Sequence, residues 1–137
     1  MENESQVPNP KSQIARDVAI RITMMPRDTN AHGTVFGGII LSYIDVAGGV
    51  EAVKTTGHDR FVTVAMKEVI FHEPVFIGDL VSFYAETTKI GNTSITVKVI
   101  VEAERFGSHG QNAVRVTEAE VAYVAINQYR EKVRIGK

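Results

Sequence analysis

The sequence predicts an α+β domain in which a curled antiparallel sheet of about five strands wraps one long central helix. The run from Gly33 to Val53 is apolar or small at almost every position, contains no proline and is long enough to form that helix. After Gly57 the chain changes to long stretches in which apolar and polar residues alternate, as in strands with one buried face. Because the helix is apolar nearly all round, only a sheet that curls around it can cover it.

The elements follow in order along a chain of 137 residues. Residues 1–15 are polar and contain prolines, so we expect a flexible arm that lacks the apolar core of a signal peptide. Residues 20–25 are predicted to form the first strand, which Pro26 and the polar turn formers after it bring to an end. The helix begins at Gly37 and continues to Lys54, where the stretch TTGH stops it.

Four long strands are predicted in the second half of the chain. The clearest alternation runs from Ile95 to Val101, where apolar side chains occupy every second position. Turn formers between successive strands predict antiparallel pairing of neighbours along the chain. The strands are expected at residues 61–71, 80–89, 94–105 and 113–126, with turns at residues 77–79, 91–92 and 107–110.

These elements fill a single domain over residues 16–128, and the basic residues 129–137 are expected to form a solvated tail. Since so small a domain leaves part of the helix and of the sheet edge uncovered, we expect two copies to pair edge to edge. The 15 Lys and Arg residues are balanced by 16 Asp and Glu residues, which excludes the general cationic field that attracts nucleic acid. The longest apolar run is too short and too often interrupted for insertion into a membrane.

The sequence contains no cysteine, which excludes disulfides, a thiol nucleophile and cysteine-ligated metals. This composition is compatible with the cytoplasm, where we expect the protein. The histidines lack the spacing of metal ligands, so no metal and no redox cofactor is expected. Any anionic ligand must be held by a local group of cations.

Asp45 is an acid inside the apolar run, and no basic residue lies within one helical turn of it. Burying an unpaired carboxylate costs several kcal/mol, so Asp45 is the first candidate for a functional group. Its side of the helix is lined mostly by small residues, whereas the opposite side is bulky and suited to a core. The first side carries Gly38, Leu41, Ser42, Gly48, Gly49 and Ala52, and the second carries Ile40, Tyr43, Ile44, Ala47 and Val50.

The glycine pair Gly48 and Gly49 leaves two interpretations open. A glycine inside a helix costs up to ~1 kcal/mol relative to alanine, which suggests that the pair makes room for something. The room could admit a substrate beside Asp45. It could equally let the helix approach its twin across a dimer interface, with Asp45 hydrogen-bonded there, and the helix pattern alone gives the two interpretations equal weight.

The start of the helix favours a ligand site. Gly37 and Gly38 place free amide N–H groups and the positive end of the helix dipole two turns from Asp45. Such groups can stabilise an oxyanion while a carbonyl carbon is attacked. Asn30 can orient a water molecule or a carbonyl, or serve only as a turn residue, and His32 can act as a base or simply be solvated. An acid together with an oxyanion pocket suggests acyl transfer to water.

The stretch NAHGTVFGGIILSYIDVAG, residues 30–48, resembles the signature of the hotdog acyl-CoA thioesterases of the YciA and cytosolic acyl-CoA hydrolase group. That signature has the pattern Asn-x-x-Gly-x-x-Phe/His-Gly-Gly, followed seven residues later by Asp. The segments VTVAMKEVIFHEPV, GD at residues 78–79 and GNTS at residues 91–94 are similar to the same family. The resemblance runs from about residue 21 to residue 127.

The resemblance implies a hotdog fold and the hydrolysis of acyl-CoA to free CoA and a carboxylic acid, in fatty acid metabolism and without a cofactor. It implies that Asp45 is a general base or nucleophile, that Asn30 of the partner subunit completes the site, and that the Gly38 amide polarises the thioester carbonyl. Each homodimer would then have two composite sites, and the family often forms a hexamer as a trimer of dimers, with CoA along subunit boundaries. Contacts to substrate or CoA are expected at His32, Gly33, Gly37, Ser42, Thr63, Val64, Gly91, Thr93 and Ser94.

Two parts of the substrate site stay open at this point. The CoA phosphates need cations, and the candidates are Lys54, Arg60, Lys67, Lys89, Arg105 and Arg115. The acyl channel needs apolar or small walls, and the candidates are Leu41, Ser42, Tyr43, Val62 and Phe71.

Three other functions are weighed against hydrolysis. DTNAH, residues 28–32, resembles the Asp-x-Asn-Pro-x-His loop of the hotdog enoyl-CoA hydratases, but it is one residue short and lacks the proline. A non-catalytic acyl-CoA sensor usually carries a DNA-binding domain, for which this chain has neither the length nor a basic helix. The presence of Asn30, Gly38 and Asp45 argues against a purely structural dimer.

Overall fold

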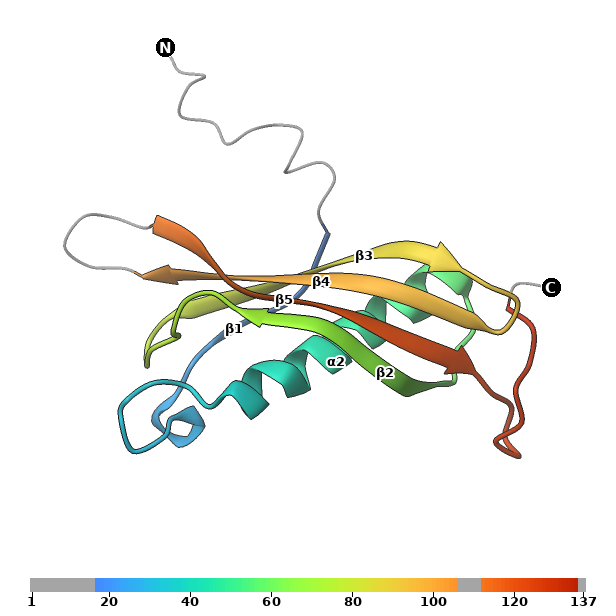
Figure 1. Cartoon of the computed structure of the whole chain (residues 1–137), viewed down its shortest axis with the longest axis horizontal. Coiled ribbons are helices and arrows are strands. Elements are labelled where there is room, and N and C mark those ends of the chain that lie inside the picture. Colours follow the sequence, from blue (N-terminus) through green and yellow to red (C-terminus); the bar gives the residue numbers. More distant parts are fainter. Residues whose placement is uncertain (1–16, 106–111, 136–137) are drawn as a thin grey trace, which may run out of the picture.

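The computed structural model describes residues 17–105 and 112–135. A five-stranded antiparallel sheet lies over one long helix, which runs along one face of the sheet (Figure 1). The strands follow the order β1-β3-β4-β5-β2, so β1 and β2 form the two edges. This architecture confirms the α+β prediction. The elements are β1 (Asp17–Thr23), the 3₁₀ turn η2 (Pro26–Asp28), α2 (Gly37–Thr56), β2 (Phe61–Phe71), β3 (Leu80–Ile90), β4 (Ser94–Arg105) and β5 (Asn112–Ala125).

Helix α2 begins where the sequence predicts and ends two residues later than Lys54. Its end is defined by Gly57, whose φ of 76° lies in the left-handed region that favours glycine and whose N–H donates to the Val53 carbonyl at 2.8 Å. The prediction that Val50 belongs to the core is wrong, because Val50 is 41% exposed. The buried residues of the helix are Ile40, Ile44, Ala47, Gly48 and Ala52.

The core lies between α2 and the inner face of the sheet, and β4 crosses its centre. Alternate side chains of β4, from Ile95 to Ala103, are fully buried, which confirms the predicted period of two. Burying a Val or Ile side chain contributes about 1.5–3 kcal/mol, so this strand is a major source of stability. The first strand ends earlier than predicted, at Thr23, because the Met24 backbone bonds to Gly78 and Asp79 instead of continuing the sheet.

The prediction that all consecutive strands pair is wrong for β2 and β3. Among the described residues, β2 pairs only with β5, and β3 pairs with β1 and β4. The turn at residues 77–79 is therefore not a hairpin. The segment between β2 and this turn bonds instead to the loop before α2, where the Val35 N–H donates to the Val75 carbonyl at 2.8 Å. The β3–β4 hairpin is confirmed, with Gly91 N–H bonded to the Ser94 carbonyl at 2.8 Å. β4 and β5 also pair antiparallel, and the turn predicted at residues 107–110 lies outside the described residues.

Edge strand β2 presents an apolar surface on the described part of the chain. Val64, Ile70 and Phe71 are each about half exposed. The register with β5 shifts between Lys67 and Ile70, and Glu68 in that interval has a φ of 55°, which marks a bulge. The predicted pairing of two copies through a sheet edge stays a prediction.

The chain beyond β5 folds back toward the β3–β4 hairpin. Val133 N–H donates to the Ala125 carbonyl at 3.0 Å, and Ile135 N–H donates to the Asn92 carbonyl at 2.8 Å. Ile135 is half-buried against the core. The arm predicted for residues 1–15 lies outside the described residues, and the domain boundaries stay predictions. None of the described residues forms a helix long and apolar enough to cross a membrane.

Candidate active site

Asp45 lies in the middle of α2, and its half-buried side chain points toward edge strand β2. The hydroxyl of Thr63 on β2 donates a hydrogen bond of 2.6 Å to Asp45 Oδ1. Oδ2 has no partner among the described residues, and no described cation forms an ion pair with this carboxylate. One carboxylate oxygen is thus held in place while the other is available to water or to a ligand.

A cavity of about 290 Å³ opens beside Asp45. One wall comes from α2 and another from the start of β2, and β5 contributes an aromatic side chain. A carboxylate at the end of a cavity with mainly apolar walls can activate a water molecule against a bound electrophile. The cavity is lined by Asp45, Val46, Gly49, Val53, Asp59, Phe61, Thr63 and Tyr123.

Tyr123 is a residue of this site that the sequence analysis does not single out. It is 2% exposed, and its hydroxyl donates a hydrogen bond of 2.6 Å to the backbone carbonyl of Asp45. Burial raises the pKa of Tyr123, and the nearby Asp45 carboxylate raises it further, so the hydroxyl stays protonated and remains a donor. Tyr123 therefore fastens the Asp45 turn of α2 to the sheet. The sequence feature that could have indicated this role is a tyrosine on the buried face of a predicted strand, because a buried hydroxyl needs a hydrogen-bond partner.

The two glycines after Asp45 have different surroundings. A β-carbon built on Gly48 would overlap the Tyr123 hydroxyl and lie 3.0 Å from ring carbon Cζ. The room at Gly48 is thus filled by the protein itself and not by a ligand. A β-carbon built on Gly49 meets no heavy atom within 4 Å, and Gly49 lines the cavity.

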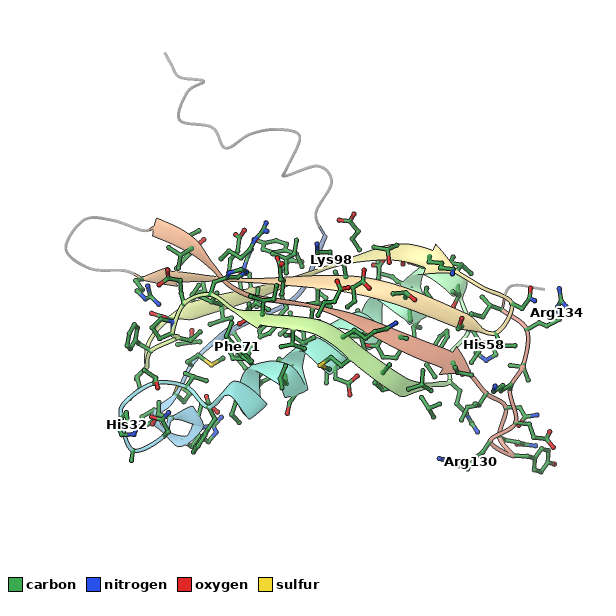
Figure 2. All side chains as sticks on the ribbon, in the orientation of Figure 1. His32, His58, Phe71, Lys98, Arg130 and Arg134 are labelled. Carbon is green, nitrogen blue, oxygen red and sulfur yellow. The ribbon has the colours of Figure 1, made fainter. Side chains whose placement is uncertain are left out.

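Asn30 holds the loop before α2 together. Its Oδ1 accepts hydrogen bonds from the N–H groups of His32 at 2.8 Å and Thr34 at 3.2 Å, and its Nδ2 donates to Thr34 Oγ1 at 3.0 Å. The turn role considered for Asn30 is therefore real. An amide nitrogen carries two protons, and the second has no partner among the described residues. His32 is exposed in this loop (Figure 2), and Gly33 permits the turn with a φ of 85°.

The amides of Gly37 and Gly38 are the first two of α2. The helix has no side-chain cap, and these N–H groups have no acceptor outside the helix within the described residues. A β-carbon on Gly37 would lie 3.3 Å from the Phe71 ring, while Gly38 faces open space. A second cavity of about 380 Å³ begins here, lined by Val35, Gly37, Ile40, Phe71, His72, Glu73, Pro74, Val75 and Thr117.

A single chain does not bring all of the predicted catalytic residues together. Gly38 precedes Asp45 by about 10 Å along the helix axis. Neither Gly38 nor Asn30 lines the cavity that contains Asp45. Within this chain, Asp45 and Thr63 therefore stand apart from the loop of Asn30 and the start of α2.

The remaining predicted contacts are spread over the fold. Ser42 Oγ donates to the Gly38 carbonyl at 2.9 Å within α2, and Val64 is exposed on β2. Gly91, Thr93 and Ser94 belong to the β3–β4 hairpin, which contacts the end of β5 and lines neither cavity. Their part in substrate binding stays a prediction.

Two of the candidate cations for the CoA phosphates already have partners. Arg105 pairs with Asp79 at 3.1 Å and donates to the Pro74 carbonyl at 2.6 Å, so it braces the β2–β3 connection. Arg115 lies 3.3 Å from Glu118. No group of three potential metal ligands occurs among the described residues. Arg60, Lys67 and Lys89 make no side-chain ion pair within residues 17–105 and 112–135.

Comparison with known proteins decides the family. Residues 32–107 match the family model described as Thioesterase superfamily. The chain belongs to the thioesterase superfamily. This thioesterase-superfamily chain is similar to the acyl-CoA thioester hydrolase YciA of Escherichia coli K12, with 38% identity over 113 residues that cover 81% of this chain and 84% of YciA. It is 39% identical to YciA of Salmonella typhimurium over 113 residues, which cover 81% of this chain and 84% of that relative.

Solved structures of related thioesterases have the same fold. Cj0915, a hexameric hotdog fold thioesterase of Campylobacter jejuni, superposes with a TM-score of 0.81 at 44% identity, covering 86% of this chain and 89% of Cj0915. HI0827, a hexameric broad specificity acyl-coenzyme A thioesterase, superposes with a TM-score of 0.81 at 34% identity, covering 88% and 81%. The hotdog fold and the family resemblance predicted from the sequence are confirmed.

Proposed function

We infer that the protein hydrolyses acyl-CoA thioesters to free CoA and a carboxylic acid. The observation that carries this proposal is the Asp45 carboxylate, held at one oxygen by Thr63 and free at the other, in an open cavity of a thioesterase-superfamily fold. The names of the YciA relatives and of HI0827 support the same substrate class. CoA enters as part of the substrate, and the reaction needs no resident cofactor.

The proposed reaction uses Asp45 as a general base. Oδ2 accepts a proton from a water molecule as the water oxygen attacks the thioester carbonyl carbon. The carbon–sulfur bond then breaks, and the CoA sulfur takes up the proton from Asp45, which releases free CoA and restores the carboxylate. A thioester is already activated toward attack, so one base with an oxyanion pocket is a sufficient apparatus. If Asp45 acted instead as a nucleophile, it would form a mixed anhydride with the acyl group as CoA leaves, and a single turnover in ¹⁸O-labelled water would place ¹⁸O in its carboxyl group when the water attacks the aspartyl carbonyl.

The proposed oxyanion donors lie at the start of α2. The Gly38 N–H lacks an acceptor outside the helix, and the second Nδ2 proton of Asn30 is also unpartnered within the described residues. Because one chain keeps these groups apart from Asp45, we assign them to a second copy, so that each dimer has two composite sites. The hexameric state named for Cj0915 and HI0827 supports a trimer of dimers.

Thr63→Val is expected to lower kcat for acyl-CoA hydrolysis about tenfold with little effect on KM. Valine has nearly the shape of threonine but cannot donate to Asp45 Oδ1, so the carboxylate loses its fixed orientation; a net hydrogen bond of about 1–1.5 kcal/mol corresponds to this factor. Steady-state kinetics measure it. Thr63→Ser, which keeps the hydroxyl, should retain most of the activity, and equal losses in both variants would contradict the role.

Mixing two inactive variants tests the composite site. Asn30→Ala and Asp45→Ala are each expected to be nearly inactive, and subunit exchange between them should restore part of the activity. A mixed dimer has one site in which Asp45 meets an intact Asn30, so random exchange gives up to about one quarter of wild-type turnover. If mass spectrometry shows that the subunits have exchanged and activity still does not recover, both residues would be assigned to one chain.

The direct test of the function is thiol release from saturated acyl-CoAs of increasing length. The proposal expects turnover with at least one of them. A parallel assay with crotonyl-CoA distinguishes hydrolysis from the hydratase alternative, since hydration consumes the double bond and leaves the thioester intact. Binding of acyl-CoA without hydrolysis or hydration would favour the sensor alternative and overturn the proposal.

A further inference from the structure

Gly49 is a mid-helix glycine that the fold of the chain does not require. Its φ is not positive, and an added β-carbon would meet no atom within 4 Å. Neighbouring Gly48, by contrast, is required by Tyr123. Alanine at position 49 would favour the helix more than glycine does. The missing side chain at Gly49 therefore keeps space open, and that space is the cavity of Asp45.

The cavity follows the helix axis. Asp45, Gly49 and Val53 are spaced four residues apart, so they lie on one side of α2 over about 12 Å. Phe61 and Thr63 of β2 form the facing wall. The cavity is thus a groove that starts at the Asp45 carboxylate and runs toward the C-terminal end of α2.

The walls of this groove fit an alkyl chain. The polar side chains of the lining are Asp45, Thr63, Tyr123 and Asp59, whereas Val46, Gly49, Val53 and Phe61 supply apolar walls. The pantetheine arm of CoA carries two amides, which would lose hydrogen bonds to water without finding partners there. The carboxylate of Asp59 at the far end would repel phosphate.

We propose that the acyl chain of the substrate lies in this groove, extending from Asp45 past Gly49 toward Val53, and that Gly49 and Val53 determine which chain lengths are accepted. This inference rests on the proposed function. Each methylene that enters the groove should raise kcat/KM about fourfold until the chain reaches Val53. Beyond that point the gain should stop.

Two substitutions at different depths test the proposal. Gly49→Val fills the groove one turn from Asp45, and it should lower kcat/KM at least tenfold for every chain long enough to pass it while acetyl-CoA is spared. Val53→Phe fills the groove one turn further on and should affect only longer chains. The matched control is Val50→Phe, because Val50 is exposed to the same extent as Val53 (41% against 40%) but does not line the groove.

The measurement is kcat/KM for thiol release over acetyl- to palmitoyl-CoA, together with the oligomeric state by light scattering. The proposal is supported if the longest acyl chain that is hydrolysed efficiently is shorter for Gly49→Val than for Val53→Phe, with the assembly unchanged. If both variants change all chain lengths equally, or leave the profile unchanged, the inference fails while the hydrolase function stands. If Gly49→Val dissociates the assembly, the groove is a contact between copies and the inference is overturned. A wild-type protein that hydrolyses none of these substrates refutes the proposed function itself.

Discussion

Asp45→Ala is expected to lower acyl-CoA hydrolysis by about 100- to 10,000-fold, the usual contribution of a general base. The substitution removes the proposed proton acceptor, while the proposed oxyanion donors at the start of α2 stay intact. Substrate binding should persist, because the apolar groove walls of Val46, Gly49, Val53 and Phe61 and the helix amides are unchanged. The loss should therefore appear in kcat more than in KM, as measured by thiol release with the preferred acyl-CoA.

Glu51→Ala is the matched control for Asp45→Ala. Glu51 is an acid on the same helix that also accepts a threonine hydrogen bond from the sheet, from Thr87 Oγ1 at 2.9 Å, but it lines neither cavity. Both variants lose one half-buried carboxylate, so similar melting temperatures are expected. Substantial turnover by folded Asp45→Ala, or an equal loss in Glu51→Ala, would remove Asp45 from the role of base.

The helix, the strand alternation and half of the candidate site could be predicted because they depend on local pattern. The buried period of β4 is visible in its own residues, and the motif from Asn30 to Asp45 lies within one short segment. Such features need no knowledge of which distant segments meet. The same motif also located the free amides of α2, because helix geometry leaves the first N–H groups without acceptors wherever a helix begins.

Strand order and the surroundings of the glycines could not be predicted for the opposite reason. The turn residues at 77–79 indicate only that the chain changes direction there. They do not show that β2 pairs with β5, a strand that lies far along the chain. Tyr123 lies 78 residues from Asp45, and only the folded sheet brings its hydroxyl to the helix. Gly48 and Gly49 are chemically identical in the sequence, yet one is filled by Tyr123 and the other borders a cavity.

Gly48→Ala is expected to destabilise the protein by roughly 2–4 kcal/mol. Overpacking and loss of the buried hydrogen bond from Tyr123 to the Asp45 carbonyl outweigh the better helix propensity of alanine. The new methyl group would overlap the Tyr123 hydroxyl, and the ring has little space to move because it is buried against Phe61, with centroids 6.4 Å apart. Chemical denaturation measures the change. Since Tyr123 fastens the Asp45 turn of α2, activity should fall as well.

Gly49→Ala provides the control, since it adds the same methyl group one residue further along the same helix. Its β-carbon meets open space, so the stability should equal or exceed that of the wild type. Adding Tyr123→Phe to Gly48→Ala removes the overlapping oxygen and should recover part of the lost stability. Equal stability of Gly48→Ala and Gly49→Ala would contradict the packing of Tyr123 into the Gly48 hollow, and with it the account of how the sheet holds Asp45 in place.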